Sequence, residues 1–221
     1  MTGLNMGIKL LYRSLRDEQQ MEELKRQNLQ AEMDYLRYQI NPHFFMNTLN
    51  NIHALIDIDT EYAKSAVIEL SKMMRYVLYE SGSETISLKK DIQFIENYIE
   101  LMRIRYDSSI DIRFDYPDSI PNKVAIPPLL LIVFVENAFK HGVSYNHASF
   151  IHIRIGYRDD AVTAVISNSR HEKSRPGTTG IGLENVKKRL ALIYQDNYTL
   201  SIDDSDPAVY TVKLIIPIMP C

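Results

Sequence analysis

The sequence predicts an α+β fold in which a helical region is followed by a two-layer sandwich of helices and a sheet. Up to residue 106, apolar residues recur at steps of three and four, which is the spacing of one buried helix face. From residue 110 onward, short apolar and alternating runs typical of strands are separated by two further helical segments. The order of these elements indicates the helical region first and the sandwich second.

The first segment, residues 6–56, is expected to form one long helix with a kink near Pro42, because proline cannot donate an i→i−4 hydrogen bond. Residues 17–32 are dense in Glu, Gln, Lys and Arg, so they can pair in a coiled coil only through a sparse apolar seam. The apolar stripe shifts phase at the proline. We expect it to run through Leu29, Met33, Leu36 and Ile40, and then through Phe45, Leu49, Ile52 and Ile56.

Two more helices complete the helical region. One spans residues 62–80 and ends at a Ser-Gly-Ser turn, and the other opens at residues 87–91. Their buried stripes are expected at Val67, Leu70, Met74 and Val77, and at Ile92, Ile95, Ile99, Met102 and Tyr106.

The sandwich is expected to contain two helices and a set of strands. One helix, residues 127–141, starts with prolines and is followed by a glycine, and the other, residues 182–194, follows a Gly-rich loop. The strands are expected at residues 110–116, 151–157, 162–168, 198–203 and 209–216.

Composition excludes several classes of function. A net charge of −3 gives no electrostatic basis for direct binding of nucleic acid. The only cysteine, Cys221, is the final residue, so a disulfide framework and a Cys-based metal site are both excluded. No run of about 18 apolar residues occurs, so this chain is not expected to span a membrane by itself.

Three short segments carry the chemistry. Asn-Pro-His-Phe-Phe-Met-Asn, at residues 41–47, sets His43 beside the apolar stripe, with Asn47 four residues later on the same helix face. The second segment is Val-Glu-Asn-Ala-Phe-Lys-His-Gly, at residues 135–142. The third, Gly-Ile-Gly-Leu at residues 180–183, enters a helix whose free backbone amides and dipole suit phosphate oxygens.

With these segments in this order and spacing, the chain resembles the cytoplasmic part of bacterial sensor histidine kinases of the LytS/YehU/YesM type. The resemblance covers roughly residues 18–217. It implies a signalling or coiled-coil helix at residues 6–40, a helical dimerisation and phosphoacceptor region at residues 41–106, and a Bergerat-type (GHKL) ATP-binding domain at residues 107–218.

The resemblance also implies that His43 is the phosphoacceptor. Many related kinases carry an acid next to this histidine to orient its ring, whereas the neighbour here is Phe44. Asn41, Asn47 or a backbone carbonyl is left to orient the ring.

On the nucleotide side, Asn137 is expected to bind Mg²⁺, because a neutral amide oxygen can complete an octahedron of phosphate and water oxygens. Lys140, one turn on, can reach a phosphate, and His141 either joins it or only ends the helix. Related GHKL ATPases carry a water-activating glutamate where this chain has Val133, so transfer to His43 is favoured over hydrolysis. The phosphate loop comprises Gly180, Ile181, Gly182 and Leu183.

The adenine-reading position departs from the family pattern. It is normally Asp, and we expect Ser167 to stand there, followed by Asn168. A hydroxyl in place of a carboxylate loses on the order of 1–2 kcal/mol, or roughly ten-fold in affinity for ATP. Thr211 on the last strand is a further candidate contact to the nucleotide.

The resemblance implies an ATP- and Mg²⁺-dependent protein-histidine kinase that forms a homodimer and phosphorylates a response-regulator aspartate, often in a regulator of the LytTR type. Family members usually follow transmembrane segments. We therefore expect the cytoplasmic portion of a bacterial inner-membrane protein, attached to the membrane only through N-terminal segments that this sequence lacks. The alternative is a catalytically weak or inactive dimeric signalling module, whose Ser167 site holds nucleotide poorly.

Overall fold

The structure is a computed structural model that describes residues 16, 21, 42–106, 110–144, 146–171 and 181–219, with only the backbone at Pro42, His43 and Ile181. The chain divides into two compact units, Met1–Ile40 and Asn41–Cys221. Apart from Arg16 and Met21, the expected signalling helix of residues 6–40 lies outside the described residues, and the boundary expected at residue 106 stays a prediction. No helix in the described ranges is both long and apolar enough to cross a membrane.

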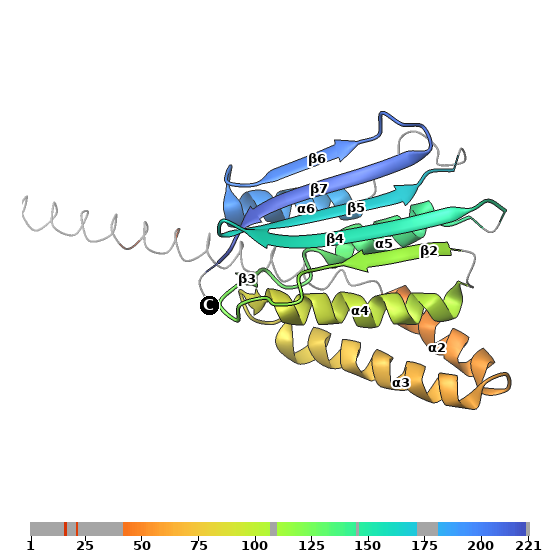
Figure 1. Cartoon of the computed structure of the whole chain (residues 1–221). Coiled ribbons are helices and arrows are strands. Elements are labelled where there is room, and N and C mark those ends of the chain that lie inside the picture. The colour runs from red at the N-terminus through yellow and green to blue at the C-terminus, as the bar shows by residue number, and fades with distance from the viewer. Residues whose placement is uncertain are drawn as a thin grey trace, which may run out of the picture. The chain divides into compact units, whose positions relative to one another are not determined.

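The helical region contains three α-helices, α2 (Pro42–Ile56), α3 (Thr60–Arg75) and α4 (Leu88–Arg105) (Figure 1). Pro42 is the first residue of α2, a position where its missing N–H costs nothing. Asp59 caps α3 by accepting a hydrogen bond from the Tyr62 backbone N–H at 2.9 Å. A π-helical turn, η1 (Tyr76–Glu80), follows α3 directly.

The buried faces of α2 and α3 differ from the expected stripes. Residues expected to be buried, Leu49 and Ile56 in α2 and Val67 and Met74 in α3, are exposed in the single chain. Ile52 and Leu70 are buried as expected. The other residues that pack inside the chain are Phe44 and Thr48 in α2, and Ala63, Ala66 and Met73 in α3. Both helices therefore carry two apolar faces, and only one of them is covered.

The α4 stripe is confirmed for its first four members. Ile92, Ile95, Ile99 and Met102 are all buried, whereas Tyr106 is half-buried just after the helix ends. Because α4 is apolar on most sides, it can form the centre of the helical region.

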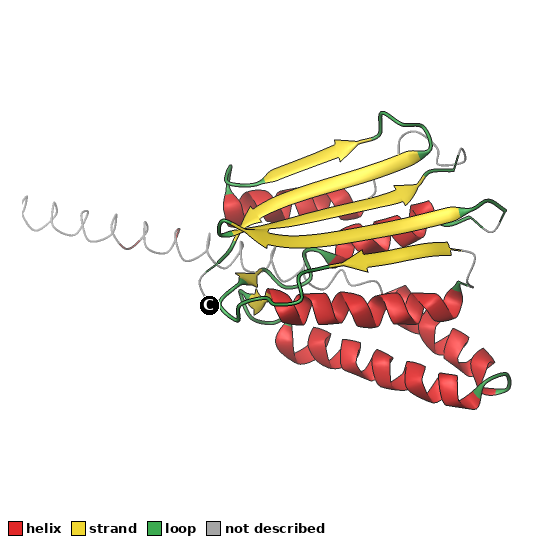
Figure 2. Cartoon of the chain, in the orientation of Figure 1, coloured by secondary structure: helices red, strands yellow, loops and turns green. Residues whose placement is uncertain are grey.

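The sheet has the strand order β2-β4-β5-β7-β6. β2 runs parallel to β4, and the other neighbours are antiparallel. The two remaining helices, α5 (Ile132–Gly142) and α6 (Ile181–Tyr194), cover one face of this sheet, which confirms the α+β class (Figures 1 and 2). The strands are β2 (Ile110–Asp115), β4 (Ser149–Arg158), β5 (Ala161–Ser169), β6 (Thr199–Asp203) and β7 (Val209–Pro217).

Two short strands were not expected from the sequence. β1 (Ile86–Ser87) pairs antiparallel with β3 (Ala125–Ile126) just before α4 begins. Two residues are too few to show an alternating pattern, so the sequence carries no signal for this pair.

The segment between β3 and α5 delays the start of α5 by five residues relative to the expectation, from residue 127 to Ile132. Leu129 has φ 59°, a left-handed conformation that a helix cannot contain. Its backbone N–H donates a hydrogen bond of 3.2 Å to the carboxylate of Asp91 in α4. This bond ties the segment to the helical region.

Asp91 is fully buried at this junction. The Tyr76 hydroxyl also donates to its Oδ1 at 2.7 Å. From α6, Arg189 donates to the carbonyl of Pro128 at 2.6 Å and attracts the Asp91 carboxylate. Burial outweighs these contacts and raises the pKa of Asp91 to about 6.

The raised pKa of Asp91 predicts a stability that falls as pH rises. Between pH 3.8 and about 6 the folded chain holds a proton on Asp91 that the unfolded chain releases. Across this window Asp91 should cost up to about 3 kcal/mol of unfolding free energy. Asp91→Asn, which keeps the acceptor oxygen, should match the unchanged chain near pH 4 and exceed it in stability above pH 6.

Urea unfolding at a series of pH values measures this difference. The control is Asp111→Asn, because hydrogen bonds from Arg113 and His152 lower the pKa of the exposed Asp111 and give a dependence of opposite sign. Parallel pH curves for Asp91→Asn and the unchanged chain would show that Asp91 is not the group that titrates.

Candidate functional site

Helix α5 carries three of the candidate ligands, Asn137, Lys140 and His141, within about one turn. Asn137 is half-buried, and its side-chain amide makes no hydrogen bond to the other described residues. Val133 lies one turn earlier, and a Cβ placed on Gly182 would lie 3.6 Å from Val133 Cγ1. The start of α6 is therefore next to the face of α5 that carries Val133 and Asn137.

The start of α6 offers backbone donors to this region. The first four N–H groups of an α-helix have no partner within the helix, and the dipole makes that end positive. Of the four expected phosphate-loop residues, Gly180 lies outside the described part of the chain and Ile181 is described in its backbone alone. Gly182 lies in the first turn, and Leu183 is 7% exposed, so its side chain belongs to the core.

The far end of α5 approaches strand β5 very closely. A Cβ on Gly142 would lie 2.7 Å from the Cβ of Asn168, a distance that real Cβ atoms do not tolerate. The Ser169 hydroxyl donates to the carbonyl of Gly142 at 2.6 Å. Asn168 is 3% exposed and lies on the helix-covered face of the sheet, and its amide donates to the Ser169 carbonyl at 2.8 Å.

Ser167 and Thr211 lie on the opposite face of the sheet. Side chains alternate along a strand, so Ser167 points away from the face that Asn168 shares with α5. Its hydroxyl pairs with that of Thr211 at 2.9 Å. We call this uncovered side, with Arg113, His152, Ser167 and Thr211 across neighbouring strands, the open face.

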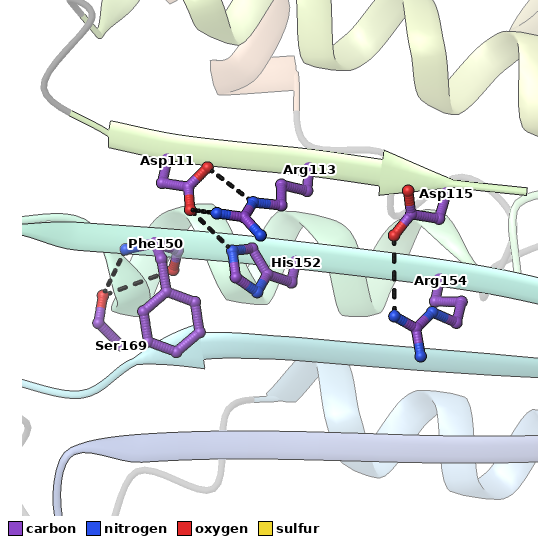
Figure 3. Close-up of polar contacts among 7 residues, drawn as sticks. All are labelled: Asp111, Arg113, Asp115, Phe150, His152, Arg154 and Ser169. Carbon is purple, nitrogen blue, oxygen red and sulfur yellow. Dashed lines mark hydrogen bonds and ion pairs between the residues drawn. The ribbon is translucent and has the colours of Figure 1, made fainter.

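The part of the open face formed by β2 and β4 carries charged pairs. Figure 3 shows the Asp111 carboxylate between Arg113 and His152, at 2.8 and 3.1 Å, and Arg154 near Asp115 at 3.9 Å. These pairs are solvent-exposed and contribute little to stability.

The candidate nucleotide residues thus fall into two groups. Asn137 and Gly182 lie together on the helix side, and Lys140, His141 and Asn168 lie toward the end of α5 on the same side, whereas Ser167 and Thr211 lie on the open face.

Titratable groups at α5 are shifted in pKa. Burial raises the pKa of Glu136 to about 7, and the charge of Lys140 lowers it only in part. Desolvation, and second the charge of Lys140, lower the pKa of His141. His141 is therefore neutral at pH 7, and Lys140, exposed at the helix end, supplies positive charge at this site.

His43 lies in the first turn of α2, and only its backbone is described. Asn47 lies one turn later and is half-buried. Phe44, next to His43, is buried and its ring lies 5.0 Å from the ring of Tyr98 in α4. Phosphoacceptor and orienting roles for His43 and Asn47 stay predictions.

The donor set fits a magnesium ion held mainly by phosphate and water. Within the described residues, no three His, Cys, Asp or Glu side chains come together as a metal site. Asn137 offers one neutral oxygen without competing bonds to described residues, which suits a cation whose other ligands come from a nucleotide.

Sequence reasoning missed the roles of Gly142 and Glu136. Gly142 was expected only as a helix end, but it is needed because no Cβ fits against Asn168. Burial raises the pKa of Glu136 to about 7, and a sequence does not display that burial.

Comparisons with known proteins place these features in context. Residues 31–110 match the family model described as histidine kinase. Sensor protein LytS of Staphylococcus saprophyticus subsp. saprophyticus is 33% identical over an alignment of 204 residues that covers 85% of this chain and 34% of that protein. Sensor histidine kinase/phosphatase LytS of Staphylococcus aureus is 31% identical over an alignment of 191 residues that covers 79% of this chain and 32% of that protein. The chain thus spans about a third of the length of the curated relatives it matches.

Solved structures give weaker similarities. The histidine kinase domain of the Erythrobacter litoralis blue-light activated histidine kinase is 14% identical, with a TM-score of 0.46 over 87% of this chain and 96% of that chain. The catalytic domain of histidine kinase ThkA is 18% identical, with a TM-score of 0.45 over 62% of this chain and 97% of that chain.

Gly142→Ala tests the close approach of α5 to β5. We expect a loss of about 1–3 kcal/mol in unfolding free energy, because the new methyl group must displace Asn168 or the end of α5. Thermal and urea unfolding measure the loss. Gly82→Ala is the matched control, since a Cβ there meets nothing within 4 Å and should change stability by less than about 0.5 kcal/mol. Equal effects of the two substitutions would contradict the packing argument.

Proposed function

Because this chain belongs to the histidine kinase family, we propose that it is the kinase portion of a two-component sensor. In this proposal His43 accepts the γ-phosphoryl group of ATP and passes it to an aspartate of a response regulator. The observation that carries the proposal is the placement of Asn137 beside the start of α6, a neutral metal ligand next to free phosphate-binding amides.

The phosphates are proposed to bind at the start of α6, with Lys140 as a further cation at the end of α5. Asn137 would hold Mg²⁺, which when bound neutralises charge on the phosphate oxygens. The Val133 side chain and the Gly182 backbone would lie next to each other between Asn137 and the start of α6. Positioning and charge neutralisation are the main contributions to phosphoryl transfer.

Transfer to histidine is favoured over hydrolysis at this site. Val133 stands one turn before Asn137 and has no proton acceptor to activate water. In the transfer, a neutral imidazole nitrogen of His43 forms a bond to the γ-phosphorus, and the bond to the β,γ-bridging oxygen breaks and leaves ADP. The same phosphoryl group then moves to the regulator carboxylate and regenerates the histidine.

We place the adenine base on the helix side, near Asn168. The side chain of Asn168 lies at the end of the α5 face, whereas Ser167 and Thr211 bond to each other on the open face. The amide of Asn168 is neutral, so the base would lack a charged acceptor, as was also expected for Ser167. Adenine contacts at Ser167 and Thr211 stay predictions, and this placement of the base favours Asn168 over them.

The exposed faces of α2 and α3 support a homodimer. Large apolar side chains point away from the chain along both helices, and a contiguous apolar surface of this kind marks an interaction site. Pairing with a second copy would cover these residues in a four-helix arrangement. They include Met46, Leu49, Ile56, Val67, Ile68 and Met74.

A non-catalytic dimeric signalling module is the second candidate. The sequence Ser167-Asn168-Ser169 at the end of β5 favours it, because no carboxylate stands there to read the base. Such a module would dimerise and bind its partner but hold nucleotide poorly.

Incubation with γ-labelled ATP and Mg²⁺ tests the kinase proposal. The unchanged chain should take up label that is lost in acid and retained in base, as expected of a phosphoramidate at a histidine. His43→Gln should bind Mg-ATP with unchanged affinity and take up no such label. Labelled His43→Gln would move the acceptor elsewhere, and an unlabelled parent that binds nucleotide poorly would favour the signalling module.

In the same assay Asn137→Ala tests whether Asn137 binds Mg²⁺. Labelling and the Mg²⁺-dependent part of nucleotide affinity should both be lost, while thermal unfolding of the nucleotide-free chain should change little, because the amide is half-exposed. A collapse of that stability would make Asn137 a structural residue.

The position of the base predicts different effects for two neighbouring residues. Asn168→Ala should weaken ATP roughly ten-fold, from ~1–2 kcal/mol for one lost hydrogen bond. Ser167→Ala should change ATP affinity by less than about two-fold, because its hydroxyl faces the other side of the sheet. Calorimetric titration of both variants decides between them, and a larger effect at Ser167 would return the base to that residue.

A further inference from the structure

We infer that Tyr98 is the positioning residue that couples the nucleotide-bearing helix α5 to the turn of α2 that carries His43. This inference rests on the kinase function proposed above and assigns a role to a residue that takes no part in the chemistry described so far.

Tyr98 lies between two aromatic rings from different helices. Its ring centroid is 5.0 Å from that of Phe44 in α2, with the planes tilted by 33°. It is 5.6 Å from that of Phe139 in α5, with the planes at 74°. All three side chains are buried, so the column Phe44–Tyr98–Phe139 is shielded from water and runs from α2 to α5.

Phe44 is the residue through which the first turn of α2 is held. Its ring is buried, whereas Phe45 is half-buried and Met46 is exposed. The Thr48 hydroxyl donates to the Phe44 carbonyl at 2.9 Å and so connects this turn to the next. Since Phe44 directly follows His43, the contact with Tyr98 fixes the backbone that carries the phosphoacceptor.

Phe139 connects the column to the nucleotide site. It lies two residues after Asn137 and directly before Lys140, on the same helix. A helix moves as a stiff element, so a shift of α5 when a ligand engages Asn137 or Lys140 also moves Phe139. Tyr106, just after α4, stacks on Phe139 with the ring centroids 6.2 Å apart.

The contact of Tyr98 with its two neighbours depends on its ring and not on its hydroxyl group. Burial, and next the nearby carboxylate of Glu136, raise the pKa of Tyr98 well above its usual value, so the ring is neutral. Ring geometry within the range that aromatic pairs prefer carries the coupling instead. Tyr98→Phe should therefore preserve it, and Tyr98→Leu should remove it while keeping an apolar core residue.

A second aromatic pair on α4 provides a matched control. Phe94 stacks on Tyr76 of η1 at 4.5 Å and is 2% exposed, against 3% for Tyr98. Among the described residues, neither ring of that pair stacks on α2 or α5. Phe94→Leu should therefore lose similar packing without touching the column.

Steady-state labelling with γ-labelled ATP separates positioning from binding. Tyr98→Leu should slow labelling at saturating ATP by about ten-fold or more and change the KM for ATP by less than about two-fold. Tyr98→Phe and Phe94→Leu should both stay within about two-fold of the parent rate. A rate loss in Phe94→Leu equal to that in Tyr98→Leu, at equal thermal stability, would overturn the assignment.

A spectroscopic arm detects the coupling without any chemistry. The chain has no tryptophan, so Phe45→Trp introduces a single indole fluorophore next to the column. The ring of Phe45 lies 5.4 Å from that of Phe44. Addition of ATP with Mg²⁺ should shift this emission in the otherwise unchanged chain and leave it unshifted in the Tyr98→Leu background, although both bind nucleotide by calorimetry. Equal shifts in both backgrounds would overturn the coupling.

The two arms distinguish failure of this inference from failure of the kinase proposal. A parent that binds nucleotide and shows the emission shift but takes up no label would contradict the kinase function and support the coupling. A parent that is labelled normally but shows the same rate in Tyr98→Leu would support the kinase function and overturn the coupling. A parent that binds no nucleotide would overturn both.

Discussion

The hydrogen bond that the buried Asp91 carboxylate accepts from the Leu129 N–H sets the position of helix α5. This bond holds Leu129 in a left-handed conformation, and the turn at Leu129 decides that α5 begins at Ile132. A start one residue earlier or later would rotate α5 by about 100° and move Asn137 off the face that meets α6. Burial of the Asp91 carboxylate lowers stability, but its hydrogen bond fixes the orientation of α5.

The proposed nucleotide site would work with few formal charges. A neutral amide, the backbone amides at the start of α6 and one exposed lysine would bind the phosphates there. Such groups bind a nucleotide through the charges that it and its metal bring with them. Affinity for a nucleotide would then depend on where these groups lie. The packing of Gly142 against Asn168 and of Tyr98 against Phe139, which positions α5, would therefore matter more than additional charged side chains.

Sequence patterns predicted the class, the order of the elements and the α4 stripe, because α4 buries nearly all of its apolar residues in one chain. They failed where geometry turns on a single residue. In α2 and α3, Leu49 and Val67 belong to a second apolar face, and periodicity does not say which face is covered. The adenine contact expected at Ser167 stays a prediction, because Ser167 and Asn168 differ only in strand parity and a one-residue choice exchanges the two faces of the sheet. The delayed start of α5 required the Asp91 contact, which joins residues 38 positions apart.

The uncovered apolar faces of α2 and α3 also affect how much of the protein accumulates in a cell. Under the proposed homodimer, a newly made copy that has not met a second one displays Leu49, Ile56, Val67 and Met74 to its surroundings. Exposed apolar surfaces attract chaperones and proteases, which clear unassembled chains. Abundance of the protein would then rise more steeply than its rate of synthesis, since only chains that find a partner quickly would escape degradation.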